Sequence, residues 1–304
     1  MREIKKIIWA TDGSKESNDA LNYAIFLAQK FGSKIIGVHV IEMPEKQLYE
    51  YLNDPESEIY YGWMEKAEES YKARLASIGD EMSSQGVSFQ GEILRGEPNK
   101  RIVEFARSEK ADLIVMGRRG LGLIDRILIG SSTLKVLRES NVPVLAVKRK
   151  GDIVDIRSIL VPLNIYEQSD SALKYAMDLA ERINASISVL YVFGLYPYYN
   201  DYEIPPSVVE DLIKLSSNKL RERVENIKLK RGVRNKEATK LEINTEIIQG
   251  INSSVAIIDY ASSKDIDLIV MNTHGRKGIK RFILGSVTEK VIQESPCAVL
   301  ALKP

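Results

Sequence analysis

The chain has 304 residues, 44% of them hydrophobic and 28% charged, with 43 basic and 42 acidic side chains. The formal charge of +1 gives no net positive field for a nucleic-acid backbone, which argues against a dedicated DNA or RNA binder. One cysteine and two histidines exclude a disulfide framework and argue against a zinc site. No run approaches the roughly 20 apolar residues of a membrane span, and the N-terminus breaks at Asp12 and Gly13 too soon for a secretory signal, so we expect a cytoplasmic protein with no membrane partner.

The second half of the chain repeats the first at a shift of 152 to 155 residues. The run 7–12 matches 159–164, the run 37–40 matches 189–192, and the run 111–117 matches 266–272. A period of this length indicates a duplicated domain. We therefore predict one domain over 1–150 and a second over 151–304, with the boundary where Lys148 to Asp155 interrupts the apolar pattern.

In the first copy, short apolar runs alternate with helical periodicity. Residues 4–10 form the first run, a helix follows that ends at Gly32, and 35–41 form the second run. We expect a long polar helix within 64–84, a strand over 87–94 and a helix from Pro98, a residue favoured in a first turn.

Residues 112–116 and 142–147 complete the series of apolar runs in the first copy. Runs that are apolar on both faces and alternate with helices indicate a parallel sheet covered on each side. The fold class is therefore α/β, with two tandem doubly wound domains, each a five-stranded parallel sheet flanked by helices.

Ligands of such sheets bind beyond the carboxyl ends of the strands, at the switch point in strand order. After the first run come Thr11 to Ser14, and after the fourth comes a glycine-rich segment that leads to Gly130 and a helix. Glycine lets the backbone turn sharply against a ligand, and the unpaired N–H groups at a helix N-terminus attract anions. A phosphate would suit this arrangement.

The spacing of Gly117, Gly120, Gly130 and Ser131 resembles the nucleotide-binding signature of the ATP-binding universal stress proteins. The flanking residues agree, and the resemblance covers essentially the whole chain, twice. It implies an α/β sandwich around a five-stranded parallel sheet, with ATP or AMP as the ligand and Mg²⁺ accompanying the phosphates.

The resemblance also assigns roles to residues of the first copy. Asp12 and Val40 would hold the base and ribose; Met116, Gly117 and Gly120 would line the ribose and phosphate turn; Gly130, Ser131 and Ser132 would take the phosphates; Ala10 and Arg118 complete the candidate set. Arg118 and Arg119 invite a phosphate role, although exposed loop arginines are usually only solvated.

The second copy departs from the signature. Asn272 replaces the first glycine and Asn164 replaces Asp12. The asparagine side chain occupies space where a ligand would approach, and a neutral acceptor in place of a charged one costs about 1 kcal/mol. We expect the first copy to be the better site. The second keeps Val192, Gly275, Gly285 and Ser286, so binding there stays open as weakened, altered or absent.

Several of these residues have structural alternatives. Asp12 could cap the first helix, and Ser131 or Ser286 could cap theirs, with Glu289 completing a capping box for Ser286. Nine of the fourteen tyrosines lie in 49–63 and 191–202. We favour a packed insertion helix or loop for these segments, and a partner surface or nucleotide lid is the alternative.

The last strands, 142–148 and 297–303, are apolar and would invite aggregation if uncovered. Related proteins use this strand as a dimer contact, so we expect the copies to pair as an intramolecular pseudo-dimer, with a homodimer of whole chains as a further level.

The leading functional hypothesis is an adenine-nucleotide-binding regulatory protein of the stress response, with an unidentified protein partner. The alternatives are a slow ATP hydrolase or phosphotransferase and a ligand-free scaffold. A dedicated enzyme is not indicated, because the chain has no Gly-x-x-x-x-Gly-Lys-Ser/Thr loop and we assign no catalytic residue or metal ligand.

Overall fold

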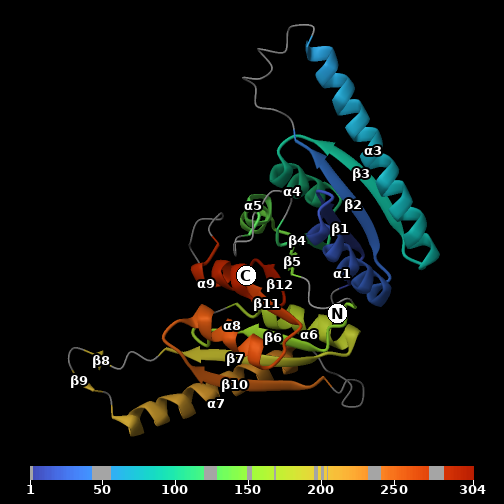
Figure 1. The fold of residues 1–304 in the computed structure, drawn as a ribbon. Coiled ribbons are helices and arrows are strands. Elements are labelled where there is room, and N and C mark those ends of the chain that lie inside the picture. The colour runs from blue at the N-terminus through green and yellow to red at the C-terminus, as the bar shows by residue number, and fades with distance from the viewer. Residues whose placement is uncertain are drawn as a thin grey trace. The chain divides into compact units, whose positions relative to one another are not determined.

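The computed structural model describes residues 3–42, 56–119, 129–148, 153–167, 169–194, 198–199, 202–203, 205–231, 241–273 and 284–304. These residues fall into two compact units, Glu3–Val147 and Lys148–Pro304, in which helices and strands alternate (Figure 1). We refer to them as the first repeat and the second repeat.

The first repeat is a five-stranded parallel sheet in the order β3-β2-β1-β4-β5. Because the order reverses at β1, the switch point lies between β1 and β4. The elements are β1 Lys6–Thr11, α1 Lys15–Phe31, β2 Lys34–Ile41, α3 Glu56–Ser84, β3 Phe89–Arg95, α4 Pro98–Ser108, β4 Leu113–Gly117, α5 Ser131–Glu139 and β5 Val144–Val147.

The second repeat has the same parallel arrangement, in the order β10-β7-β6-β11-β12. Its elements are β6 Ser158–Pro162, α6 Ser171–Ile183, β7 Ser186–Phe193, α7 Pro206–Lys230, β10 Ile243–Gln249, α8 Ser253–Ser263, β11 Leu268–Asn272, α9 Ser286–Glu294 and β12 Ala298–Leu302. The second tyrosine-rich segment also contains a short antiparallel pair, β8 Tyr198–Tyr199 and β9 Tyr202–Glu203, which the sequence did not predict.

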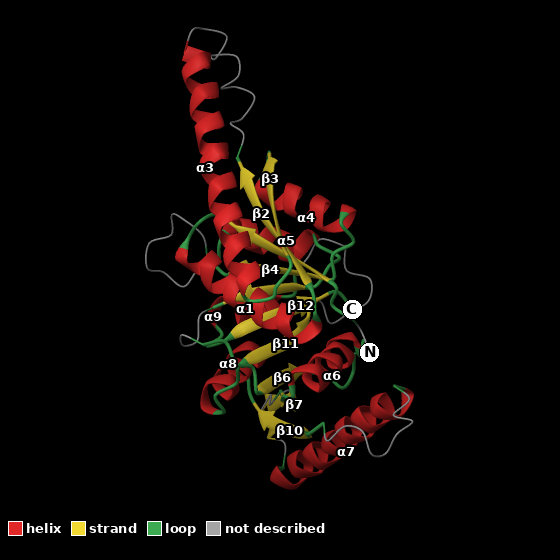
Figure 2. Cartoon of the chain, turned by 90° about the vertical axis from the view of Figure 1, so that its right-hand side faces the viewer, coloured by secondary structure: helices red, strands yellow, loops and turns green. Residues whose placement is uncertain are grey.

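The central strands of both sheets are buried on both faces, as their continuous apolar runs predict. Ile8, Trp9 and Ile114 are 0% exposed in the first repeat, and Ile159 and Ile269 are 0% exposed in the second. Helices flank each sheet, with α3 beside β3 and α7 beside β10 (Figures 1 and 2). The predicted fold class is confirmed.

Local signals in the sequence set several element boundaries. Helix α1 ends at Gly32, whose φ of 70° lies in the left-handed region that favours glycine. Helix α4 begins at Pro98, as expected. Helix α3 is longer than predicted and begins at Glu56. The side chain of α3 that reaches the loop after β1 is Arg74, which lies inside the predicted range.

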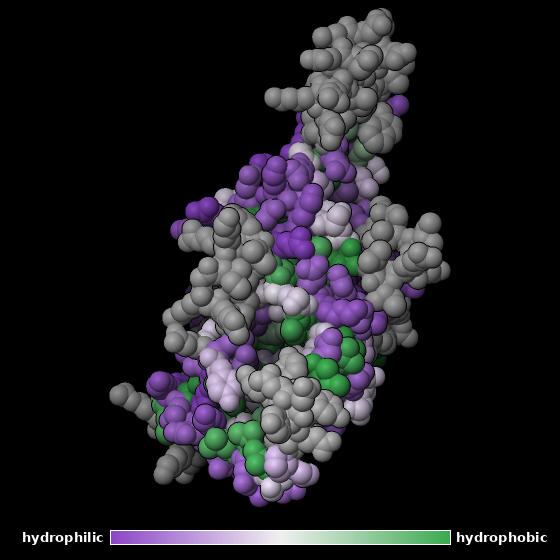
Figure 3. Space-filling model, turned by 90° about the vertical axis from the view of Figure 1, so that its left-hand side faces the viewer, coloured by the Kyte–Doolittle hydropathy of each residue, from purple (hydrophilic) through white to green (hydrophobic). Residues whose placement is uncertain are grey.

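The face of the molecule in Figure 3 shows mainly polar side chains, with hydrophobic ones in small separate groups. Within the described residues, no helix is both long and apolar enough to cross a membrane.

Candidate functional site

The carboxyl ends of β1 and β4 lie side by side at the switch point of the first repeat. Ala10 is the register partner of Met116, so Asp12, which follows β1, and Gly117, the last residue of β4, lie at the same edge of the sheet. Val40 lies near the end of β2, the neighbour of β1 on its other side. Five residues that the sequence analysis assigned to a nucleotide site are therefore gathered at one sheet edge.

The turn after β1 is built from Asp12, Gly13 and Ser14. Gly13 has a φ of 84°, a conformation that side chains rarely adopt. Asp12 Oδ1 accepts hydrogen bonds from Ser14 N at 3.0 Å and Ser14 Oγ at 2.6 Å. Ser14 Oγ in turn accepts from Ser17 N at 3.1 Å, which makes Ser14 the N-cap of α1. The suggestion that Asp12 caps this helix is wrong, because Asp12 instead fixes the residue that does.

Gly117 is required for close packing between β4 and α1. A Cβ added to it would lie 2.9 Å from both the carbonyl carbon and the carbonyl oxygen of Glu16, in the first turn of α1. Its φ is not positive, so the need for glycine here is steric and does not come from a left-handed turn. The carbonyl oxygen of Gly117 accepts a hydrogen bond from Thr133 Oγ1 at 2.9 Å. This bond joins the end of β4 to the first turns of α5.

Helix α5 presents its N-terminal N–H groups near this strand end without a side-chain cap. Its N-cap is Gly130, which makes no side-chain hydrogen bond to the helix. The N–H of Gly130 donates to the carbonyl of Arg118 at 2.9 Å, so the helix start is fixed beside the end of β4. Ser131 is exposed and Ser132 is half-buried in the first turn. Uncapped N–H groups at a helix start favour an anion.

Two capping alternatives from the sequence are wrong. The caps of α5 and α9 are Gly130 and Gly285, so Ser131 and Ser286 are the first helical residues. No side chain caps α9, so the capping box that was the alternative for Ser286 and Glu289 does not form. The side chains of both serines are thus not committed to their helix ends.

Other predicted site residues have different outcomes. Arg118 is 5% exposed, so the interpretation of a solvated loop arginine does not apply to it. Gly120 and Gly275, which complete the glycine spacing in the two repeats, lie outside the described residues.

The sequence analysis missed His39, Tyr71 and Arg74. The His39 ring stacks on Tyr71 with centroids 3.5 Å apart, and its Nδ1 lies 2.9 Å from the Thr11 carbonyl oxygen. Burial, the largest cause, lowers the pKa of His39 below its usual value. Arg74 Nη2 donates to the Gly13 carbonyl at 3.4 Å. The spacing of Tyr71 and Arg74, three residues apart on one helix face, was the available signal.

The corresponding edge of the second repeat is built differently. With Tyr23 aligned on Tyr175, Ser171 corresponds to Asp19, so α6 lacks the first turn of α1. Asn272 Oδ1 accepts a hydrogen bond from Ser171 Oγ at 2.6 Å, at the start of the shortened helix. The side chain that replaces the Gly117 hydrogen is thus accommodated because the first helix begins one turn later.

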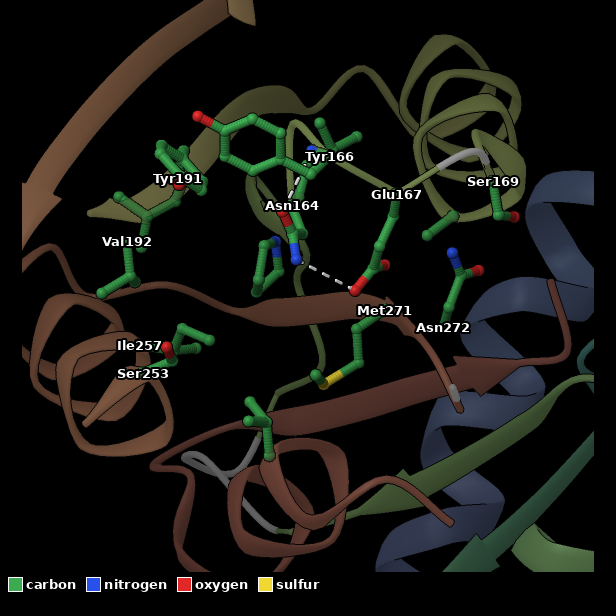
Figure 4. A pocket seen from close by; sticks show the side chains of 15 residues that line it. Asn164, Tyr166, Glu167, Ser169, Tyr191, Val192, Ser253, Ile257, Met271 and Asn272 are labelled. Carbon is green, nitrogen blue, oxygen red and sulfur yellow. Dashed lines mark hydrogen bonds between the residues drawn. The ribbon is translucent and has the colours of Figure 1, made fainter. Parts of the chain in front are cut away.

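A pocket of about 280 Å³ opens at this edge of the second repeat (Figure 4). It is lined by Pro162, Leu163, Asn164, Tyr166, Glu167, Ser169, Ala172, Leu190, Tyr191, Val192, Ser253, Ile257, Met271, Asn272 and Val287. Val192, Asn164 and Asn272, which the sequence placed in this site, all line it. Gly285 and Ser286 begin the neighbouring helix α9, where the Gly285 N–H donates to the Thr273 carbonyl at 2.8 Å.

A profile of the Universal stress protein family matches the chain twice, over residues 3–148 and 155–303. The chain belongs to the universal stress protein family. It carries the family domain as a tandem repeat, which confirms the resemblance drawn from the glycine spacing.

Individual universal stress proteins match one repeat or both. A universal stress protein of Methanocaldococcus jannaschii is 34% identical over 145 residues, which cover 48% of this chain and 82% of that protein. One from Mycolicibacterium smegmatis is 23% identical over 309 residues, covering 98% of this chain and 97% of that one. The crystal structure of a universal stress protein from Archaeoglobus fulgidus matches with a TM-score of 0.71 at 22% identity, covering 99% of this chain and 97% of that one, which supports the shared fold.

The part of this universal stress protein that the structure describes contains no group of three or more histidine, cysteine, aspartate or glutamate side chains arranged to hold a metal ion. Cys297 is buried, and because it is the one cysteine of the sequence it forms no disulfide within the chain.

Proposed function

We propose that the first repeat binds an adenine nucleotide, ATP or AMP, and that the protein is a nucleotide-binding regulator of the stress response. The observation that carries this proposal is the uncapped start of α5, fixed beside the end of β4 by the Gly130–Arg118 and Thr133–Gly117 hydrogen bonds. The glycine spacing supplies the ligand class, because it resembles that of ATP-binding members of the family.

The residues around this helix start suit a nucleotide. Main-chain N–H groups at the positive end of α5 would take the phosphates, with Ser131 and Ser132 in the same turn. Asp12, Val40 and Met116 lie at the neighbouring strand ends, where the base and ribose would lie. We propose that Mg²⁺ enters with the phosphates of ATP, and titrations with and without EDTA test this part separately.

The test is a charge placed at the start of α5. Ser131→Glu puts a carboxylate where the phosphates would bind, yet a negative charge at a helix N-terminus stabilises the helix, so the fold is retained. We expect at least about a tenfold loss of ATP affinity by calorimetry, equal to about 1.4 kcal/mol. Ser286→Glu, the same change at the start of α9, is the matched control and should leave this affinity unchanged. Undiminished binding in Ser131→Glu would contradict the proposal.

Nucleotide recovered from the purified protein identifies the natural ligand. Denaturing the protein and chromatographing the released molecules should yield about one adenine nucleotide per chain if the first repeat alone is occupied. A regulator returns added ATP largely unchanged after hours, whereas steady accumulation of ADP at about 1 s⁻¹ or faster, reduced by Asp12→Ala, would favour the hydrolase alternative.

A further inference from the structure

Strand β3 is the outermost strand of the first sheet, and no strand in the described part of the chain pairs with its outer edge. The Ser88 carbonyl, just before β3, accepts a hydrogen bond from Ile35 N of β2 at 2.8 Å, so Ser88 faces β2. The N–H and C=O groups of successive residues in a strand point alternately to opposite sides. Those of Phe89, Gly91 and Ile93 therefore point outward, away from β2.

This edge lacks the features that usually prevent a strand from being added. Natural sheets block their edges with bulges, prolines, lysines or a covering element. The register of β3 with β2 is unbroken from Phe89 to Arg95, and this segment contains no proline and no lysine. Its one basic residue, Arg95, lies at the end of the strand and forms an ion pair with Glu68. Within the described residues, the middle of β3 is therefore an unprotected edge.

A groove of about 480 Å³ lies between this edge and α3, the helix beside β3 in Figure 1. Its apolar residues are Leu75, Ala76 and Gly79 of α3 and Phe89, Gly91 and Ile93 of β3. A Cβ added to Gly91 would lie 2.7 Å from Leu75 Cβ, so the helix packs this close to the strand because residue 91 is glycine. The same contact shows that the odd-numbered positions of β3 face α3. An apolar side chain of an added strand would enter the groove on this face.

Glu92 places a carboxylate beside the groove. Strand alternation puts its side chain on the face of the sheet away from α3. Glu92 Oε1 accepts a hydrogen bond from Gln90 Nε2, and Gln90 Oε1 accepts one from Lys34 Nζ. Glu92 Oε2 accepts none from the residues that the structure describes. Opposite charges that face each other across neighbouring strands stabilise the pair, so a basic residue on an added strand would complement Glu92.

A second copy of the chain does not fit this edge. Helix α3 packs mainly on β3, and a two-fold antiparallel pairing of two β3 strands would place both α3 helices on the same face. Paired strands lie about 4.8 Å apart, whereas the axes of packed helices need about 8 to 10 Å. The two helices would collide. An extended peptide brings no helix of its own, and strand addition to a sheet edge is an established mode of peptide recognition.

We propose that the groove beside β3 binds an extended peptide of a partner protein as an added strand, with apolar side chains toward α3 alternating with basic side chains toward Glu92. The outward N–H and C=O groups of Phe89, Gly91 and Ile93 form its backbone hydrogen bonds. The site lies at the outer edge of the sheet, two strands away from β1, and does not depend on the proposed nucleotide site.

Amide exchange with water, measured by NMR on the full chain, tests the backbone pairing. The probe is the peptide Val-Lys-Val-Lys-Val-Lys-Val with blocked ends. The outward N–H groups of Phe89, Gly91 and Ile93 should exchange at least about tenfold more slowly when the peptide is bound. The N–H groups of Gln90 and Glu92, which already bond to β2, should change little. A peptide with glutamate in place of each lysine should bind at least about threefold more weakly.

Two alanines of α3 provide a matched pair of variants. Ala76 lines the groove and Ala73 does not, and both are exposed, so arginine at either position adds the same charge without disturbing the core. Ala76→Arg should weaken binding of the lysine peptide by at least about tenfold, and Ala73→Arg by about twofold or less. Glu92→Gln should remove the preference for lysine over glutamate.

Three results would each overturn the proposal. They are unchanged exchange at Phe89, Gly91 and Ile93 in the presence of the peptide, equal weakening by Ala73→Arg and Ala76→Arg, and equal affinity for the lysine and glutamate peptides.

Discussion

At the start of the first strand of each repeat, the backbone N–H groups donate to an aspartate that precedes the fourth strand of the parallel sheet. Asp112 Oδ2 accepts from the backbone N–H groups of Lys5 and Lys6 at 2.8 and 3.1 Å. Asp267 Oδ2 accepts from those of Arg157 and Ser158, both at 3.0 Å. The amino ends of the two sheets thus share the same pair of backbone hydrogen bonds, and Asp267 accepts one more, from Ser158 Oγ at 2.9 Å.

The carboxyl ends differ. In the first repeat, Gly117 lies against the first turn of α1, whereas in the second repeat Asn272 contacts Ser171 where that turn is missing. The buried strands therefore maintain the fold in both copies, while a small number of residues beyond the strand ends set the shape and charge of each site. A duplicated domain can therefore change the shape of a candidate site while its buried strands stay alike.

Exchanging the glycine for asparagine in the first repeat should have the largest effect. Gly117→Asn places a Cβ 2.9 Å from the backbone of Glu16, and overpacking of this kind costs about 1 to 3 kcal/mol. Urea unfolding followed by tryptophan fluorescence measures it, because both tryptophans, Trp9 and Trp63, lie in the first repeat. The reverse change, Asn272→Gly, loses the Ser171 hydrogen bond and should cost less. Its unfolding is followed by circular dichroism, because the second repeat contains no tryptophan. Equal costs would show that α1 does not require the glycine.

The second largest difference between the repeats should come from removing one arginine in each long helix, Arg223 in α7 and Arg74 in α3. Arg223→Ala breaks three hydrogen bonds, one of them to a partly buried aspartate, and should destabilise the second repeat by about 1 to 2 kcal/mol after screening. Arg74→Ala loses only bonds of 3.4 Å at an exposed position and should cost about 0.5 kcal/mol or less. Amide hydrogen exchange over 164–170 should accelerate in Arg223→Ala; unchanged protection would mean that the loop does not depend on this side chain.

A smaller difference in stability should come from the N-cap of α1, because α6 has no equivalent side-chain cap. Ser14→Ala removes the side chain that accepts from Ser17 N and should cost about 1 kcal/mol. Helix α6 has no side-chain hydrogen bond at its N-cap, Asp170, so it has no corresponding contribution to lose. Thermal unfolding of Ser14→Ala beside Ser286→Ala, a first-turn serine that does not cap its helix, measures the difference. A cost shared by both variants would be unrelated to capping.

The smallest expected effect is on the acid response. Burial lowers the pKa of His39 in the folded state, outweighing the Thr11 carbonyl and Asp12, which favour the protonated ring. The unfolded chain therefore binds the proton more readily, so stability is fully present above about pH 6.5 and falls as the pH decreases through the folded value. The equivalent residue in the second repeat is Tyr191, whose pKa burial raises. His39→Gln should flatten the dependence of urea unfolding between pH 7.5 and 5. If the pH dependence of stability persists in His39→Gln, it arises from other titratable groups.

The sequence predicted the fold because its signals there are local. Continuous apolar runs such as 113–116 mark buried strands, Gly32 marks a helix end and Pro98 a helix start. The predicted site residues are brought to one edge because parallel strands share their carboxyl ends, and whether they contact a nucleotide stays a prediction. The late start of α6 could not be predicted, because it accompanies a hydrogen bond to Asn272, 101 residues away.

Other site details depend on geometry that residue types do not show, some of it local and some of it at a helix start. Ser14 and Asp12 are both good cap residues by type, and the structure alone shows which of them accepts from Ser17. The sequence did not single out Glu167, because the equivalent residue of the first repeat, Lys15, is an ordinary helical residue of α1. Glu167 lines a pocket because α6 begins later than α1 does. Residue types alone therefore did not show which residue caps α1 or where α6 begins.

The close packing of Gly117 against α1 also determines the order in which changes to these domains can be made. A glycine is compatible with either a long or a short first helix above it, whereas an asparagine is compatible only with the short one. A redesign that gives the first repeat the features of the second should therefore first remove the first turn of α1 and then replace Gly117. In the opposite order, the intermediate would carry the full steric cost of the added side chain.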